Sequence, residues 1–173
     1  YVPQTCIDPF GGSGTTALTA QFLGIRPTTI EVNPFLADLI EAKLQSYDPQ
    51  ALLASYSRVL DVVSASTGEP WAILASAPRT MVAPGVNGRW IYSADVAERI
   101  LAYRGAIEAL NDPSHARLFK VLLGSTLVEL SNVVISGKAR RYRSGWERRV
   151  VHPTQVGRAF QAAFLNALED VVR

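Results

Sequence analysis

The residues with the clearest capacity for chemistry lie near the start of the chain, in a glycine-rich turn. Gly12-x-Gly14-x-x-Ala17 matches the G-x-G-x-x-G/A pattern of a strand-to-helix turn. Glycines permit the positive φ angles of a tight turn and let a ligand approach the backbone closely. The N–H groups that open the following helix, around Ser13 to Thr16, would then point at an anionic group of that ligand.

Glu31 is the second candidate. It follows Gly11 by 20 residues, at the end of a predicted second strand. An acidic side chain at this place can accept hydrogen bonds from ribose hydroxyls. The same pattern leaves open an ordinary turn with a surface glutamate, an NAD site, or a site for another ribose-containing ligand. A P-loop is disfavoured, because no Lys-Ser/Thr pair follows the glycines.

A βαβ frame is needed to bring these residues together, and the local pattern predicts one over residues 1–47. The predicted elements are a strand at Thr5–Ile7, a helix at Thr15–Leu23, a strand at Pro27–Val32 and a helix at Phe35–Gln45. Asn33-Pro34 is a strong helix start, with asparagine as the cap and proline in the first turn. Strand, helix and strand in this order predict an α/β fold with a parallel pair.

The remaining residues, 48–173, form a second region that is predicted to be mainly helical. Helices are expected over 49–64, 93–110, 115–135 and 154–173, with a loop over most of 67–90. The helix at 115–135 is the longest apolar run, and Gly137 is predicted to end it. A basic segment, 138–149, follows directly.

The glycine turn carries a resemblance to a known family. Asp8-Pro9-Phe10-Gly11-Gly12-Ser13-Gly14-Thr15-Thr16 resembles motif I of the amino-group DNA methyltransferases, D-P-F-x-G-S-G-T-T, at every fixed position. Ile30-Glu31-Val32-Asn33-Pro34 resembles the family's next motif, G-x-E-x-N-P, with Thr29 where glycine is common. The resemblance covers about residues 4–45. It implies a partial Rossmann-like methyltransferase fold and S-adenosylmethionine as the methyl donor.

Roles for individual residues follow from this resemblance. It places Asp8 against the cofactor's α-amino group and Glu31 on its ribose hydroxyls, while Asn33 lies near the adenine or simply caps a helix. Phe10 is either a cofactor contact or a core aromatic. The residues that the resemblance assigns to the cofactor are Asp8, Phe10, Gly12, Ser13, Gly14, Thr15, Thr16, Glu31 and Asn33.

The family's catalytic motif, (D/N/S)-P-P-(Y/F/W), is missing, because the chain contains no Pro-Pro dipeptide. The nearest matches, Ala77-Pro78-Arg79 and His152-Pro153-Thr154, lack both the second proline and the aromatic residue. No catalytic residue is therefore assigned. The chain opens on Tyr1 and a helical pattern reaches Arg173. We expect a piece of a longer protein, with the catalytic motif beyond Arg173.

Charge is unevenly distributed along the chain. The formal net charge is +2. Residues 137–173 hold eight basic and three acidic residues, a net of +5, and the rest hold nine basic and twelve acidic, a net of −3. The 138–149 segment interleaves cations that bind phosphates with aromatics that stack on bases or wedge between them. We expect DNA contacts from Lys138, Arg140, Arg141, Tyr142, Arg143, Trp146, Arg148 and Arg149. The alternative is that Trp146 is a buried anchor and the arginines are solvated or paired.

Composition excludes several other classes of protein. With 173 residues and 48% apolar content the chain can build a hydrophobic core. The single Cys6 excludes an internal disulfide framework, and two distant histidines, His115 at an exposed helix start and His152 as a cap, make no metal site. No signal peptide and no apolar run of roughly 20 residues is present, so we expect a cytoplasmic protein without membrane contact.

The sequence is compatible with three functions. The first is a DNA methyltransferase of a restriction-modification or related system, or its S-adenosylmethionine-binding portion, acting on adenine N6 or cytosine N4. In the family's mechanism a flipped base attacks the methyl sulfonium directly. The second is a non-catalytic nucleic-acid-binding module that kept the fold. The third is a methyltransferase of RNA or another substrate. The oligomeric state is not predicted.

Overall fold

The structure, a computed structural model, describes residues 3–66, 77–137 and 139–172, and its N-terminal part is a βαβ unit. Strand β1 (Thr5–Asp8), helix α1 (Thr15–Phe22) and strand β2 (Arg26–Thr29) follow in order, and the two strands pair in parallel. Asp8 lies opposite Thr29, so both strands end at the same edge. Helix α2 (Pro34–Leu44) comes next. The predicted strand–helix–strand–helix order is thus confirmed, although β2 ends at Thr29 and not at Val32.

Side-chain caps explain where several helices begin. Asn33 caps α2 through a hydrogen bond that its Oδ1 accepts from the Phe35 N–H at 3.0 Å. Asp48 does the same for α3 (Pro49–Ala65) and Asp112 for α5 (Pro113–Thr126). In each case proline follows the cap, where its fixed φ suits the first turn and its missing N–H costs nothing. Local sequence alone therefore specifies these three starts.

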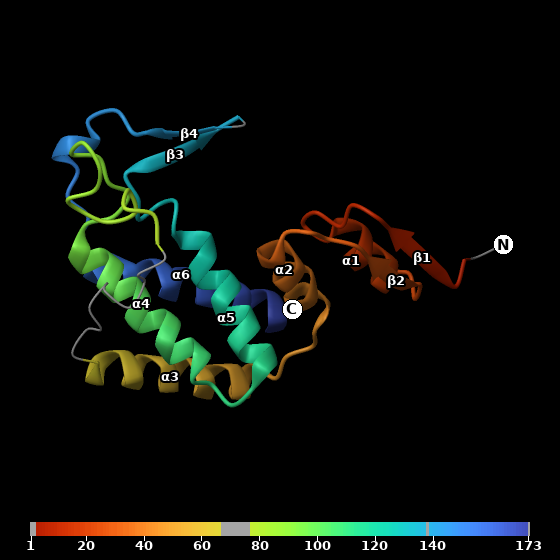
Figure 1. Cartoon of the computed structure of the whole chain (residues 1–173). Coiled ribbons are helices and arrows are strands. Elements are labelled where there is room, and N and C mark those ends of the chain that lie inside the picture. The colour runs from red at the N-terminus through yellow and green to blue at the C-terminus, as the bar shows by residue number, and fades with distance from the viewer. Residues whose placement is uncertain (1–2, 67–76, 138, 173) are drawn as a thin grey trace.

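The main hydrophobic core lies between four helices of the second region: α3, α4 (Ala94–Glu108), α5 and α6 (Thr154–Val172). Its centre is a cluster of rings in which Tyr56 stacks on Phe164 at 4.1 Å and Phe119 meets Phe160 edge to face at 6.0 Å. Figure 1 shows these helices forming the body of the molecule. The prediction of a mainly helical second region agrees with this arrangement.

His115 belongs to this core, which contradicts the expectation of an exposed helix start. The residue is 6% exposed, and its Nδ1 lies 2.8 Å from the Ser55 Oγ. The ring also lies beside Phe119. The prediction went wrong because the position in the first turn of α5 says nothing about which face of that turn meets α3.

The long helix predicted over 115–135 is also wrong in its second half. α5 ends at Thr126, and β3 (Val133–Ser136) pairs antiparallel with β4 (Ala139–Tyr142), which takes up part of the basic segment. A short 3-10 helix, η2 (Trp146–Arg148), follows. Val133, Val134 and Ile135 form a β-branched run that fits a helix or a strand by periodicity, and pairing with β4 decides the outcome.

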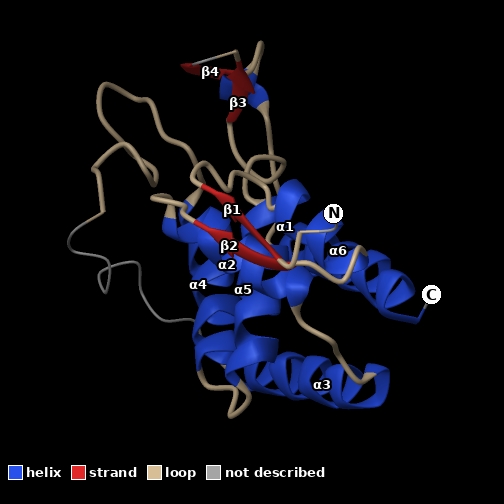
Figure 2. Cartoon of the chain, turned by 90° about the vertical axis from the view of Figure 1, so that its right-hand side faces the viewer, coloured by secondary structure: helices blue, strands red, loops and turns tan. Residues whose placement is uncertain are grey.

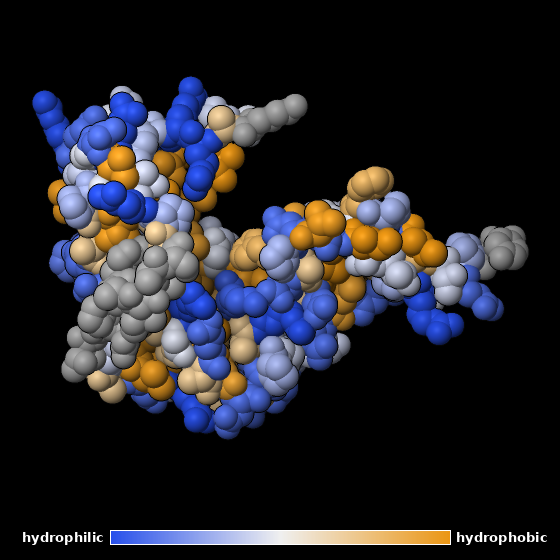
Figure 3. All heavy atoms as spheres, in the orientation of Figure 1, coloured by the Kyte–Doolittle hydropathy of each residue, from blue (hydrophilic) through white to orange (hydrophobic). Residues whose placement is uncertain are grey.

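Helix α2 attaches the βαβ unit to the helical body. Arg117 and Lys120 of α5 form ion pairs with Asp38 of α2, and Arg117 also reaches Glu41 at 2.8 Å. β1, α1 and β2 project beyond this contact (Figure 1). Orange, apolar surface gathers on the projecting part (Figure 3), where Ile7 is 72% exposed.

The described residues form two separate two-stranded sheets and are otherwise mostly helical. The chain is therefore a mixed α/β structure whose parallel pair is compatible with the first part of a methyltransferase-like fold. Within the described ranges, none of the helices combines the length and apolarity that crossing a membrane requires.

Candidate functional site

The carboxyl edge of the parallel pair brings the two predicted motifs into contact. Glu31, just after β2, accepts a hydrogen bond at its Oε2 from the Gly12 N–H, 2.8 Å away. Its Oε1 accepts a second bond from the Asn33 N–H, also at 2.8 Å. One carboxylate thus joins the glycine turn after β1 to the segment that leads into α2.

Asp8 shapes the start of the same turn. Its Oδ1 accepts a hydrogen bond from the Phe10 N–H at 3.0 Å. The Phe10 side chain is 87% exposed, which rules out the core position that the sequence left open. An acidic group and an exposed ring therefore flank the glycines on the solvent side.

Helix α1 begins without a side-chain cap, in contrast to α2, α3 and α5. Its cap position is Gly14, at φ 81°, and no side chain there accepts from the first-turn N–H groups. A Cβ on Gly14 would lie 2.9 Å from the Ile40 Cγ1 of α2, so glycine serves both the backbone angle and the close packing. The positive end of the α1 dipole therefore faces the turn at Ser13, Thr15 and Thr16.

Lys43 is a residue near this site that the sequence reasoning missed. Its Nζ donates to the Ser13 carbonyl oxygen at 2.8 Å, from a position in the last turn of α2. The ammonium group adds positive charge beside the N-terminus of α1. No local pattern singles out this lysine, because it lies 30 positions after Ser13 and only the fold brings the two residues together.

The residues of the basic segment differ in exposure and in hydrogen bonding. Arg140 and Arg141 on β4 and Arg148 on η2 are exposed. Trp146 is only 8% exposed and Tyr142 is half-buried, so the segment's tryptophan is an anchor for the fold. Lys138 lies outside the described residues.

Arg143 and Arg149 bind carbonyl groups that follow the end of α5. The Arg143 Nε donates to the Ser131 oxygen at 3.1 Å and its Nη2 to the Val128 oxygen at 3.0 Å. The Arg149 Nη2 donates to the Glu129 oxygen at 2.7 Å. These two guanidinium groups are thus engaged in holding the backbone.

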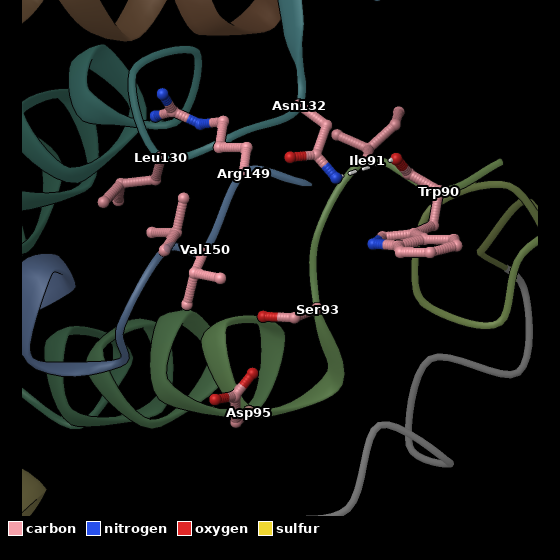
Figure 4. Close-up of a pocket in the computed structure, with 9 residues that line it drawn as sticks. Trp90, Ile91, Ser93, Asp95, Leu130, Asn132, Arg149 and Val150 are labelled. Atoms are coloured by element: carbon pink, nitrogen blue, oxygen red, sulfur yellow. Dashed lines mark hydrogen bonds between the residues drawn. The ribbon is translucent and has the colours of Figure 1, made fainter. Parts of the chain in front are cut away.

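A cavity of about 190 Å³ lies beneath the β3–β4 hairpin (Figure 4). Asn132, 6% exposed, donates from its Nδ2 to the Trp90 oxygen at 3.4 Å at one side of it. The Ser93 Oγ is buried and has no hydrogen-bond partner among the described residues. A cavity of this size, with Asp95, Asn132 and Arg149 among its lining residues, has room for ordered water, which would satisfy that hydroxyl.

Among the described residues no group of three or more His, Cys, Asp or Glu side chains gathers where it could hold a metal ion.

Comparison with known proteins gives a local match to an enzyme. The chain is 48% identical over 51 residues to the type II methyltransferase M.MjaII of Methanocaldococcus jannaschii. The match covers 30% of this chain and 10% of that relative, so the chain corresponds to a small part of its length. No family model matches the chain, and no solved structure matches it. A partial methyltransferase relationship is what these comparisons support.

Proposed function

We propose that this chain is the S-adenosylmethionine-binding portion of an amino-group DNA methyltransferase with a Rossmann-like fold, of the kind that serves restriction-modification. The proposed target is adenine N6 or cytosine N4. The observation that carries the proposal is the hydrogen bond between Gly12 and Glu31, since it joins the family's two cofactor motifs at one strand edge. The local match to a type II methyltransferase adds support.

The donor and acceptor groups at the strand edge fit this cofactor. The uncapped N–H groups at Ser13, Thr15 and Thr16 suit the cofactor's carboxylate, and the Asp8 carboxylate suits its ammonium group. Glu31 uses each oxygen once for a backbone N–H, and a carboxylate oxygen has room for a further donor such as a ribose hydroxyl. Among the nearby side chains, the exposed Phe10 ring offers an apolar wall.

The bound cofactor would supply an activated methyl group on its sulfonium. This chain's residues would hold that group in place: Asp8 and the α1 N-terminus fix the amino-acid end, and Glu31 fixes the ribose. Asn33 would lie near the adenine while it caps α2. The group that orients the target amine is expected in a (D/N/S)-P-P-(Y/F/W) motif outside this chain.

Isothermal calorimetry with S-adenosylmethionine tests the cofactor site. Glu31→Ala is expected to weaken binding by about 1–3 kcal/mol, because it deletes a charge-assisted hydrogen bond and releases the turn. Asp61→Asn, an exposed acid on α3, serves as the matched control and is expected to bind as the wild type does. Unchanged affinity in Glu31→Ala, with an intact fold by circular dichroism, would refute the assignment.

A second candidate function is a non-catalytic nucleic-acid-binding module with the same fold. The observation that favours it is the absence of any Pro-Pro dipeptide from the 173 residues. A methyl-transfer assay with labelled cofactor and the full reading frame separates the two. Transfer to duplex DNA supports the enzyme, transfer to RNA supports an RNA methyltransferase, and nucleic-acid binding without transfer supports the module.

A further inference from the structure

The β3–β4 hairpin is a two-stranded ribbon that stands away from the helical body (Figure 1). Its distal positions are exposed: Arg140 and Arg141 lie on β4, and Ile135 on β3 is 65% exposed. Residues 133–146 contain no acidic side chain. A solvent-facing ribbon with cations and an uncovered β-branched residue has the composition of a surface that meets an anionic partner.

The base of the ribbon is fixed firmly to the body. Val133 is 7% exposed, and Tyr142, its partner across the strands, packs on Trp146 with ring centroids 4.8 Å apart. Trp146 in turn meets Trp90 edge to face at 5.1 Å. The Asn132 N–H donates to the Ile91 carbonyl at 2.9 Å. The ribbon is therefore held in one orientation before any partner arrives.

The strand register distributes charge over both faces. Residues directly opposite each other in an antiparallel pair share a face, so Ile135 and Arg140 lie together, and Val134 and Arg141 lie on the reverse. Arg89, from the segment before α4, is exposed and places its guanidinium 5.9 Å from the Tyr142 ring centre. Three cations from two segments thus surround one narrow element.

The shape of this element selects among nucleic acids. The major groove of B-form DNA admits a two-stranded β-ribbon, whereas the A-form major groove of duplex RNA is too narrow for side chains to read. Binding of single strands relies on exposed aromatic platforms. Here Trp146 is buried and Tyr142 is packed against it, which disfavours single strands.

We propose that the β3–β4 hairpin enters the major groove of B-form duplex DNA, with Ile135 and Arg140 toward the base edges and Arg141 and Arg89 toward the phosphates. This inference rests on the proposed function for its choice of partner. The hairpin lies above the β1–α1–β2 unit in both ribbon views, and an open notch separates the two in the space-filling view (Figures 1, 2 and 3). DNA on the ribbon would therefore pass on the side of the glycine turn that follows β1.

Fluorescence anisotropy with a labelled DNA duplex, at several salt concentrations, tests the proposal. Arg140→Gln is expected to weaken binding roughly tenfold or more. Arg141→Gln and Arg89→Gln are each expected to reduce, by about 1, the magnitude of the slope of the logarithm of the binding constant against the logarithm of the salt concentration. Arg58→Gln, an exposed arginine on α3 far from the hairpin, is the matched control and is expected to bind as the wild type does. Ile135→Ala, which leaves the charge unchanged, is expected to weaken discrimination among DNA sequences.

Binding to the major groove, and the preference for duplex DNA over other nucleic acids, are tested with the intact chain. Methyl green, which occupies the major groove, is expected to displace the protein, and the minor-groove ligand netropsin is not. Displacement by netropsin alone, equal affinity for duplex RNA or single strands, or wild-type binding by Arg140→Gln would each overturn the proposal. Calorimetry with S-adenosylmethionine on the same samples distinguishes failure of this proposal from failure of the proposed cofactor site. Cofactor binding without duplex binding refutes only the DNA-binding role of the hairpin. Duplex binding without cofactor binding refutes only the cofactor site.

Discussion

The Gly12 N–H donates to the Glu31 Oε2 at 2.8 Å, across 19 residues of chain. The other oxygen of the same carboxylate holds the Asn33 N–H. Glu31 therefore acts as a brace between two loops. If Glu31 binds ribose hydroxyls as proposed, its fixed position would reduce the conformational entropy that binding costs.

Removal of this brace is expected to loosen the glycine turn without unfolding the chain. In Glu31→Ala the Gly12 and Asn33 N–H groups lose their acceptors, and solvent reaches them. Hydrogen exchange measured by mass spectrometry is expected to be faster in peptides that cover residues 8–16, and unchanged in peptides from α5 and α6. Unchanged exchange at the turn would show that the brace is not what orders it.

Gly14→Ala is expected to destabilise the protein by about 1–3 kcal/mol, by combining backbone strain with overpacking. Gly14 has φ 81°, and an added Cβ would lie 2.9 Å from the Ile40 side chain. Gly24→Ala is the matched control, since Gly24 has φ 70° but nothing within 4 Å of its added Cβ. Urea unfolding measures both variants. An equal loss of unfolding free energy in Gly14→Ala and Gly24→Ala would show that backbone strain alone matters and that the contact with Ile40 does not.

Gly124 lies so close to the Phe35 ring that a larger residue would clash with it. An added Cβ would lie within 2.4 Å of the Phe35 Cε2, so the ring must turn away from α5. Gly105→Ala on α4 meets nothing within 4 Å and is expected to stabilise by up to about 1 kcal/mol through helix propensity. Gly124→Ala is expected to fall short of that gain by about 1 kcal/mol. In a Phe35→Ala background the shortfall is expected to vanish, and its persistence would contradict the assigned contact.

Arg143 and Arg140 are expected to differ in their effect on stability. Arg143→Gln loses two charge-assisted hydrogen bonds to carbonyl groups and is expected to cost about 1–3 kcal/mol of unfolding free energy. Arg140→Gln changes an exposed position on β4 and is expected to stay within about 0.5 kcal/mol. Urea unfolding compares them. A larger loss of unfolding free energy in Arg140→Gln than in Arg143→Gln would contradict the structural role assigned to Arg143.

Tyr92 is expected to make stability depend on pH in the alkaline range. Burial raises the pKa of its hydroxyl from 10.0 to about 12, although the Arg140 charge opposes the shift, and the hydroxyl donates to the Leu127 oxygen at 2.9 Å. A raised pKa means that the folded state keeps the proton more tightly. The resulting stability is complete below pH 10 and is lost as pH rises toward 12. Tyr92→Phe is expected to show a shallower decline over this window in urea unfolding, and an identical decline would exclude Tyr92 as its cause.

Much of the candidate cofactor site could be predicted from sequence because its signals are local. The glycines of the turn, the acid after β2 and the Asn33-Pro34 helix start each follow from backbone geometry within a few residues. The parallel pairing of β1 and β2 then brings Asp8 and Glu31 to one edge. The roles of these residues toward S-adenosylmethionine stay predictions.

The basic segment was harder to predict because charge and ring type do not reveal burial. The sequence predicted Arg143, Trp146 and Arg149 as DNA contacts together with Arg140 and Arg141, and left open that Trp146 is a buried anchor and the arginines are solvated or paired. The fold uses the first three to anchor the hairpin and the end of α5. Arg89 could not be selected at all, since it reaches Tyr142 only through the packing of two distant segments.

The sequence by itself thus determined the βαβ unit, its glycine turn and the capped helix starts, because hydrogen bonds between near neighbours and backbone angles specify them. Only the tertiary structure decided that α5 stops at Thr126, that Val133 begins a strand, and that His115 and Trp146 are buried. An apolar or aromatic residue gains the same free energy from burial in a helix or a strand. The outcome is therefore decided by the partner that completes the packing: β4, the next strand of the hairpin, for Val133, and the distant Trp90 for Trp146.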